Sequence, residues 1–164
     1  NYYNEYALLV RTMQQQKVQP KAIFSVLGGA ASSFKFLKEF PDAANGIIDC
    51  NHWFNPKDKR AVDLRKRVEA KGLFFTYEIF NTYTAMMFLA DAINRAKSTD
   101  RAAINAALAG STFSDHFMPY GPTKMVDGQN AGAQPLMTQV LGGDIKVIIP
   151  REYRQAEPVF PMKA

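Results

Sequence analysis

Apolar residues recur at helical spacing in several stretches of the chain. From Tyr3 they follow one helix face as far as the glutamines at 14–16, which predicts a helix at the start of the sequence. The clearest helix is expected over residues 76–97, where the apolar positions persist for several turns: Ile79, Tyr83, Met86, Met87, Ala90 and Ile93. We expect this apolar stripe, with Phe88, to belong to the core. Shorter helices are predicted over 34–40, 57–71 and 101–109.

Between these helices the pattern predicts strands. Residues 22–27 form an apolar run, typical of a strand that is buried on both faces in a parallel sheet covered by helices. A second strand is expected over 47–54, after the turn signal Asn45-Gly46. Later, a short strand over 123–126 and a hairpin over 136–149 follow the helices. This order of elements indicates the α/β class.

The loop after the first strand, residues 28–33, is the best candidate for binding. Ligands of parallel sheets lie beyond the carboxyl ends of the strands, which is where this loop is expected. The paired glycines Gly28 and Gly29 allow close approach of the backbone, and the amides that open the next helix could hold an anion. The same residues also fit a tight strand-to-helix turn without a ligand, so both interpretations stay open.

Composition narrows the class of protein. The chain has 164 residues, 47% of them hydrophobic, which is enough for one domain with a core or for parts of two. The net charge is +5, but acidic residues are mixed with the basic ones, so we do not expect nucleic acid as a partner. Cys50 is the only cysteine, which excludes an internal disulfide. Neither a membrane-spanning nor a targeting segment is expected; a signal peptide, if any, would lie outside these residues.

A series of short motifs appears in a characteristic order. They are Gly46-Ile-Ile-Asp-Cys50, Tyr83-Thr-Ala85 followed by Leu89-Ala-Asp-Ala-Ile93, Asp127-Gly-Gln-Asn130, Met137-Thr-Gln139, Gly142-Gly-Asp144 and Val147-Ile-Ile-Pro150. Together they resemble the C-terminal half of a type I periplasmic binding protein. More specifically, the chain is similar to the substrate-binding proteins of branched-chain amino acid ABC transporters and to their relatives for amides and aromatic acids.

The resemblance implies parts of two three-layer αβα lobes that close over a small ligand like a Venus flytrap. Residues 1–51 would belong to the second lobe, 52–130 to the first lobe, and 131–164 to a return into the second lobe and a tail. The chain would cross between lobes near 51–57 and 129–135, and the front half of the protein would be absent. The implied function is ligand delivery to the membrane permease of an ABC importer, in the periplasm or lipid-anchored outside the cell, without catalysis or a cofactor.

The resemblance also implies positions for ligand contacts. It points to an aromatic residue at the start of the first helix, Tyr2 or Tyr3, and to the loop after the first strand, Gly28, Gly29 and Ala30. Trp53 ends a strand at the first predicted crossing, where it fits a wall of the cleft as well as ordinary packing under the hinge, and both interpretations stay open. Amino-acid binders of this family often carry a carboxylate in that loop, and here the loop lacks one. Because an unpaired ammonium is costly inside a closed cleft, an acid or an amide is favoured over an α-amino acid.

Other polar residues are given structural roles. Cys50 and His52 are two apart on a predicted strand, but nothing completes a nucleophilic or metal site around them, and His116 stands apart in a loop. The basic run over 57–67 is interpreted as a solvated helix face, and Phe74, Phe75 and Tyr77 mostly as core. Two alternatives remain: an α/β enzyme domain of hydrolase or transferase type, and a ligand-sensing domain of the same fold.

Overall fold

The strands of the protein form two separate sheets. The computed structural model describes residues 2–27 and 29–162. The larger sheet has the order β1-β2-β6-β7, with β1 and β2 parallel and the other neighbours antiparallel. The smaller sheet has the order β3-β4-β5. The strands are β1 (Phe24–Val26), β2 (Ile48–Asn51), β3 (Thr112–Phe113), β4 (Thr123–Val126), β5 (Gln129–Asn130), β6 (Leu136–Leu141) and β7 (Asp144–Ile149).

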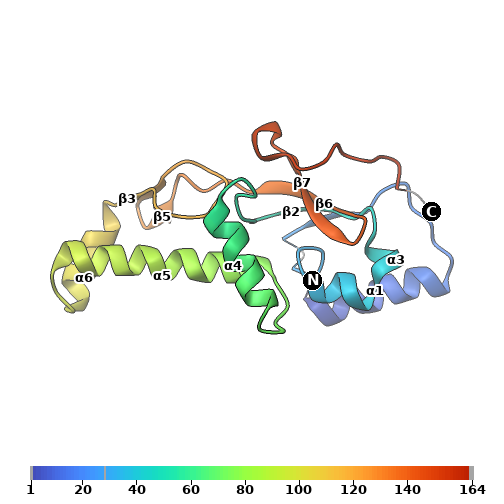
Figure 1. The fold of residues 1–164 in the computed structure, drawn as a ribbon, viewed down its shortest axis with the longest axis horizontal. Coiled ribbons are helices and arrows are strands. Elements are labelled where there is room, and N and C mark those ends of the chain that lie inside the picture. The colour runs from blue at the N-terminus through green and yellow to red at the C-terminus, as the bar shows by residue number, and fades with distance from the viewer. Residues whose placement is uncertain (1, 28, 163–164) are drawn as a thin grey trace.

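The helices divide between these two sheets. They are α1 (Tyr3–Gln15), α2 (Phe34–Glu39), α3 (Pro41–Ala44), α4 (Lys59–Glu69), α5 (Tyr77–Ala96) and α6 (Arg101–Ala109), and a 3₁₀ turn, η1 (Arg151–Tyr153), follows β7. Figure 1 shows α1 and α3 below the larger sheet, and α5 with α6 below the smaller one. Helix α4 lies between the two groups. The molecule is therefore elongated, with its two sheets at different positions along the long axis.

Local signals place the helix ends close to where the sequence predicts them. The side chain of Asp100 accepts a hydrogen bond from the Ala103 amide at 3.0 Å, which caps α6, and Gly110 follows its last residue. Asp58 caps α4 in the same way by accepting from the Arg60 amide at 2.8 Å. The predicted helices, the short strand β4 and the closing hairpin β6-β7 are confirmed. Short-range capping and turn chemistry explains this success.

An aromatic cluster lies where the larger sheet meets α4 and α5. We call Phe34, Trp53, Phe54, Phe75 and Phe80 the aromatic cluster. Trp53 contacts the other four rings, with centroids between 5.3 and 6.4 Å apart, and the rings of Phe54 and Phe80 stack at 4.5 Å. Four of its five members are almost fully buried, and Phe34 is half-buried. The second strand was expected to reach residue 54, but β2 ends at Asn51. Trp53 and Phe54 lie beyond its end and pack in the aromatic cluster.

The first strand differs from its prediction. Phe24 and Val26 are 64% and 72% exposed, and only Ser25 between them is buried, so β1 is not covered on both faces. The reason is that only the face of the sheet that carries Ser25 is covered within the described residues, while Phe24 and Val26 project from the other face. The apolar run predicted the strand correctly, but the prediction that both of its faces are buried was wrong.

Helix α5 also differs from its prediction. Its buried side chains are Phe80, Thr84 and Ala92. The predicted core stripe is only partly buried. Ile79 and Met87 pack against the core and Phe88 contacts Phe113, whereas Met86 is 60% exposed. Tyr83 is 39% exposed and stacks on Phe117 at 5.2 Å. Periodicity therefore identified the helix and part of its packed side, but it also included residues that the described chain leaves exposed.

Candidate functional site

The loop after β1 has an uncommon backbone conformation. Leu27 has φ +50° and Gly29 has φ +57°, both in the left-handed region. A leucine there costs about 1 to 3 kcal/mol, so the conformation must be imposed by its surroundings. The Leu27 amide donates to the Cys50 carbonyl at 2.9 Å, which extends the pairing of β1 with β2 to this point. Gly28, which the sequence predicts as a ligand residue, lies outside the described residues.

A buried polar group fixes the loop from below. The Ser32 hydroxyl donates to an Asp49 carboxylate oxygen at 2.5 Å, and the Asn51 amide group donates to the same oxygen at 3.3 Å. All three residues are almost fully enclosed. Asp49 lies on β2 beside Ser25 of β1, so the carboxylate links the loop to the centre of the sheet. A buried carboxylate needs such donors, and here they hold the loop in place.

Tyr77, the first residue of α5, faces this loop. A methyl group built on Gly29 would lie 3.8 Å from Cε1 and 4.0 Å from the hydroxyl of Tyr77. Burial raises the pKa of Tyr77 above its ordinary value, and the charges of Glu78 and Asp49 act in the same direction. The hydroxyl therefore stays protonated at neutral pH and can donate or accept a hydrogen bond.

Two features of this site were missed by sequence reasoning. Asp49 was not considered, because a single acidic residue inside a predicted strand carries no pattern of its own. Tyr77 was grouped with Phe74 and Phe75 as mostly core, and it does pack against the core, but its place beside the loop was not predicted. The available signal was its position at a helix start, where an aromatic ring with a polar tip can meet a neighbouring loop.

The first amides of α2 are not free to hold an anion, contrary to expectation. The Ser33 amide donates to the Ala30 carbonyl at 3.1 Å, and the Phe34 amide donates to the Phe75 carbonyl, also at 3.1 Å. The second bond accompanies a bridge between Ser33 and Thr76. These contacts join the loop to the segment that leads into α5, and they use the donors that the sequence assigned to a ligand.

The tyrosines at the start of α1 differ in their surroundings. Tyr2 is 86% exposed, and its amide is capped by the Glu5 carboxylate at 2.8 Å. The Tyr3 ring packs edge-on against Phe36 of α2, and its hydroxyl donates to Glu39 at 2.5 Å. Burial, followed by the bond to Glu39, raises the pKa of Tyr3 well above its ordinary value. Tyr3 is thus joined to the helix that begins after the loop, whereas Tyr2 points into solvent.

Ala30 and Trp53 are both about 1% exposed. Trp53 lies inside the aromatic cluster, and its indole N–H meets no hydrogen-bond acceptor among residues 2–27 and 29–162. Its ring contacts Phe34 and Phe75, whose backbones are hydrogen-bonded to each other. Of the predicted ligand residues, Gly29 and Ala30 are neighbours in the loop, and Trp53 is connected to this region through Phe34 and Phe75.

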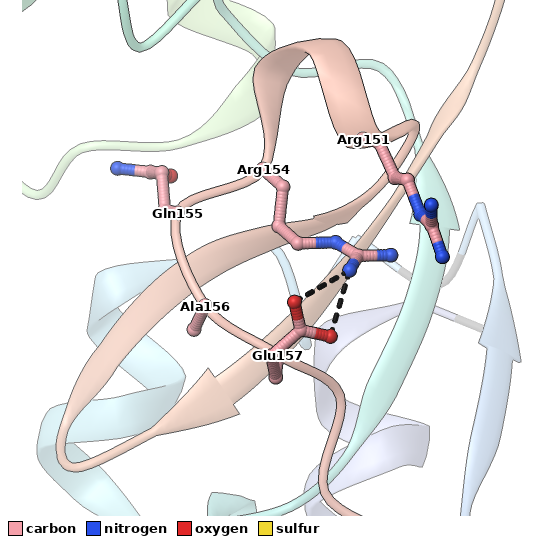
Figure 2. A pocket seen from close by; sticks show the side chains of 5 residues that line it. All are labelled: Arg151, Arg154, Gln155, Ala156 and Glu157. Atoms are coloured by element: carbon pink, nitrogen blue, oxygen red, sulfur yellow. Dashed lines mark hydrogen bonds and ion pairs between the residues drawn. The ribbon is translucent and has the colours of Figure 1, made fainter.

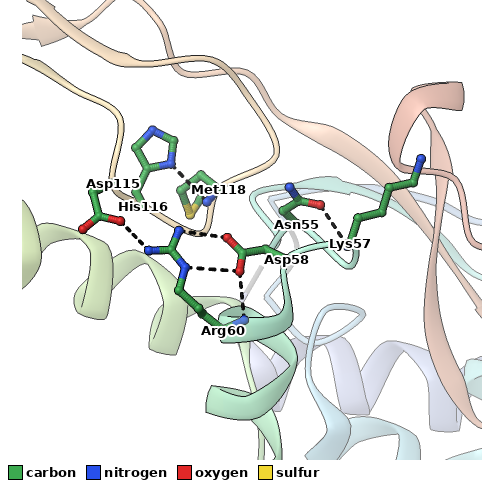
Figure 3. Close-up of polar contacts among 7 residues, drawn as sticks. All are labelled: Asn55, Lys57, Asp58, Arg60, Asp115, His116 and Met118. Atoms are coloured by element: carbon green, nitrogen blue, oxygen red, sulfur yellow. Dashed lines mark hydrogen bonds and ion pairs between the residues drawn. The ribbon is translucent and has the colours of Figure 1, made fainter.

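The first predicted crossing, residues 51–57, is anchored to a distant loop (Figure 3). The Asn55 amide donates to the Phe117 carbonyl at 2.7 Å. Arg60 pairs with Asp58 at 3.0 Å and also with Asp115. Its guanidinium lies over the Phe117 ring, 4.9 Å from the centroid. These contacts tie the start of α4 to the loop between β3 and β4 of the smaller sheet.

The basic residues of α4 are largely paired, in line with the interpretation of a solvated helix face. Lys59 pairs with Asp63, and Arg65 pairs with Glu69 at 2.9 Å. Arg65 also reaches Asp144 at 3.3 Å and lies over the Phe34 ring. The charges of three basic residues of this helix, Lys59, Arg60 and Arg65, are therefore compensated by carboxylates.

Two hollows lie away from the loop. One of about 650 Å³ is lined by residues of the tail, where Arg154 already binds both carboxylate oxygens of Glu157 at 2.7 Å (Figure 2). The other, of about 570 Å³, lies between α1, α3 and Met162. Neither lining contains a predicted ligand residue. The charge of Arg154 is compensated, so the first hollow has no obvious ligand chemistry.

Within the described ranges, no group of three or more His, Cys, Asp or Glu side chains is arranged to hold a metal ion. Cys50 is a free thiol, and β2 ends at Asn51, before His52. The helices in this part of the chain also lack the combined length and apolar character needed to cross a bilayer.

Comparison with known proteins agrees with this architecture. The family model that matches the chain is described as "Periplasmic binding protein", and the match covers residues 1–144. No curated protein sequence is similar enough to count as a match.

Several solved structures share the fold. A leucine-binding protein from Thermotoga maritima is 22% identical, with a TM-score of 0.70 over 90% of this chain and 41% of its own. A branched-chain amino acid ABC transporter protein from Thermus thermophilus, solved with bound valine, is 17% identical, with a TM-score of 0.64 over 92% and 42%. An ABC transporter solute-binding protein from R. palustris, solved with benzoate, is 19% identical, with a TM-score of 0.53 over 88% and 46%.

The chain thus spans less than half the length of each of these three structures. Its mixed sheet, with two parallel strands and an antiparallel hairpin, forms part of the type I binding-protein fold. Because the family model matches far more than half of the sequence, the chain belongs to the periplasmic binding protein family.

Proposed function

We propose that the chain is part of the extracytoplasmic solute-binding component of an ABC importer, which holds a small carboxylate, amino acid or amide between two lobes. The observation that carries the proposal is the loop after β1. Its left-handed residues are held over the buried bond from Ser32 to Asp49, next to Tyr77. A backbone fixed in this way, at the carboxyl end of a parallel strand, is suited to meet a ligand.

The proposed lobes follow the division of the strands. Residues 1–51 and 131–164 belong to the second lobe, and 52–130 belong to the first lobe. The sheet membership supports this division, because β1, β2, β6 and β7 come from the outer two segments, whereas β3, β4 and β5 come from the middle one. Closure requires that the ligand contact both lobes, so that binding favours the closed state over the open one.

In this proposal the loop residues Gly28, Gly29 and Ala30 allow the ligand to approach the backbone, while Tyr77 forms a wall with a polar tip. Tyr3 supports the site through α2, which begins just after the loop. Trp53 supports it from the aromatic cluster, and Tyr2 remains a candidate on the exposed side. The ligand is released to a membrane permease, and no bond is made or broken in the ligand.

The charge distribution favours a ligand without an ammonium group. The loop carries no acidic side chain, and the Asp49 carboxylate, which bonds to Ser32 of the loop and to Asn51, is enclosed. An ammonium at the loop would therefore lose water without gaining a charge partner from these residues. We accordingly expect an aliphatic or aromatic acid, or an amide.

Calorimetric titration of the complete protein with two ligands tests this assignment. Leucine and 4-methylpentanoate share a carboxylate and a side chain, but only leucine carries the ammonium. We expect 4-methylpentanoate to bind at least about tenfold more tightly, a difference of about 1.4 kcal/mol. Tighter binding of leucine would show that a carboxylate from elsewhere pairs with the ammonium. If neither acid nor benzoate nor valine binds, the proposed class of ligand is wrong.

Two substitutions at Gly29 test the place of the site. Gly29→Ala adds a methyl group that fits at ordinary contact distance from Tyr77, and we expect a loss of about 1 kcal/mol in stability with binding retained. Gly29→Phe carries the same backbone penalty but fills the space in front of Tyr77, and we expect it to abolish binding. Equal affinities of the two variants would place the ligand elsewhere. Recovery of unaltered ligand after binding separates a binder from an enzyme.

A further inference from the structure

The loop between β3 and β4 carries a buried histidine. We call residues 114–122 the anchor loop and residues 51–57 the crossing segment. The His116 ring packs against Phe113 and Tyr120, with ring centroids 6.1 and 5.0 Å apart, and the residue is 7% exposed. Its Nδ1 accepts a hydrogen bond from the Met118 amide at 3.2 Å (Figure 3). Because Nδ1 is the acceptor, the neutral ring carries its proton on Nε2.

Phe117 stands between the two residues of this bond and holds the crossing segment. Its carbonyl accepts from the Asn55 amide at 2.7 Å. Its ring stacks on Tyr83 of α5 at 5.2 Å, and the Arg60 guanidinium lies 4.9 Å from the ring centroid. Any backbone movement over 116–118 therefore also moves the acceptor of the Asn55 amide.

The charged and titratable groups around the His116 ring, in the part of the chain that the structure describes, are Asp115, Arg60 and Tyr120. Asp115 is paired with Arg60, and burial raises the pKa of Tyr120, so that hydroxyl stays neutral. Burial lowers the pKa of His116, and the charge of Arg60 acts in the same direction. Asp115 and the Gly121 carbonyl act against this, but burial is the largest cause.

A proton on Nδ1 conflicts with the observed conformation. It would turn the acceptor of the Met118 amide into a second donor, so two N–H groups would face each other. It would also place a positive charge in a buried position near the Arg60 guanidinium. Moving the ring into water relieves both conflicts, but the backbone around Phe117 has to move with it.

We propose that the anchor loop is a pH-sensitive anchor of the crossing segment: protonation of His116 releases the Phe117 carbonyl from the Asn55 amide. The released ring titrates near its ordinary value of about 6.5, so release is favoured below that pH. These contacts all lie within the described residues, so the anchor does not depend on the identity of the ligand. In the proposed function the crossing segment is a pivot between lobes, and the expectation that acid loosens this pivot rests on that function.

Hydrogen exchange of single amides in the complete protein, measured by nuclear magnetic resonance without ligand, tests the proposal. Protection factors are used, because they remove the pH dependence of exchange in an unstructured chain. Between pH 7.5 and 5.5 we expect the protection of the Asn55 amide to fall by at least about threefold and at most about tenfold, since release is coupled to one proton. The control is the Gln155 amide, which bonds to the Val147 carbonyl at 2.8 Å and should keep its protection.

His116→Gln is the matched variant, because glutamine does not titrate and keeps a side-chain oxygen that can accept from the Met118 amide. We expect the protection of Asn55 in this variant to be the same at both pH values. An unchanged protection of Asn55 in the unaltered protein, an equal fall in the variant, or an equal fall at Gln155 would overturn the proposal.

A second measurement covers the case in which the variant does not fold. The ring nitrogen resonances of His116 in the unaltered protein report its protonation directly, and we expect their midpoint to lie below about pH 6.5. A midpoint at or above that value would also overturn the proposal, because the anchored loop would then take up the proton without resistance.

Discussion

The aromatic cluster and the surroundings of Met86 on α5 both contain large apolar side chains, but only the first is fully covered. Trp53, Phe75 and Phe80 are at most 1% exposed, whereas Met86 is 60% exposed. The cluster draws its rings from α2, the segment after β2, and the start of α5, so residues far apart in the chain close it completely. Met86 lies further along the same helix and stays exposed, although its neighbour Tyr83 stacks on Phe117 at 5.2 Å.

This contrast shows that apolar periodicity predicts helices and their apolar faces. It does not show whether other segments of the chain pack on those faces and bury them. Phe80 is buried in the cluster and Met86 is exposed, yet the two residues are only six positions apart on α5. The edge strand β1 gives the same lesson, with Phe24 exposed and its neighbour Ser25 buried. The loop after β1 is held in place because the Phe34 amide, just after the loop, bonds to the Phe75 carbonyl, just before α5.

The largest effect is expected from removing the centre of the cluster. Trp53→Ala should lower the free energy of unfolding by about 3 to 5 kcal/mol, since it leaves a large cavity among four rings. Met86→Ala in residues 1–164 should change it by less than about 0.5 kcal/mol, because this side chain is exposed. Urea unfolding of both variants measures the difference. Equal losses would remove the distinction between the covered and the bare region.

A smaller effect is expected at the second predicted crossing. A methyl group on Gly132 would lie 2.2 Å from the Pro122 carbonyl oxygen, so the backbone would have to shift. We expect Gly132→Ala to cost about 1 to 3 kcal/mol. Gly121→Ala is the matched control, because a methyl group there meets no atom within 4 Å. If thermal unfolding shows the same midpoint for both variants, the contact between Gly132 and the Pro122 carbonyl is looser than the structure indicates.

The smallest effect concerns pH and His116, which packs against Phe113 and Tyr120 near the inner side of α5. Burial lowers the pKa of His116 below its ordinary value, so the folded protein keeps the ring neutral, and its Nδ1 accepts from the Met118 amide at 3.2 Å. The unfolded chain takes up the proton first as the pH falls below about 6.5. The contribution of His116 to stability is therefore present above that pH and is lost below it.

Urea unfolding at pH 7.5 and 5.5 measures this contribution. The unaltered protein should lose more stability between these values than the His116→Gln variant, which cannot titrate at this position. Identical losses would show that other groups dominate the acid response of this region.

Much of the fold could be predicted from the sequence, and less of the candidate site. Capping by Asp100 and the stop at Gly110 set the bounds of α6, and the turn at Gly142 and Gly143 set the hairpin. These signals act over a few residues, so they can be recognised in a single sequence. The role of Asp49 could not be predicted from the sequence, because it depends on a hydrogen bond from Ser32, which is 17 positions away. The place of Tyr77 beside the loop likewise depends on segments that are far apart in the sequence.

By itself, the sequence determined where helices and strands form and which class of fold they build, because backbone propensity, caps and turns are local. Only the tertiary structure decided which apolar faces are covered and how the loop after β1 is held. Burial depends on which segments meet in space: Trp53 meets four rings and is enclosed, whereas Met86 meets solvent. The left-handed conformation of Leu27 is likewise imposed by its surroundings, since an isolated leucine avoids it.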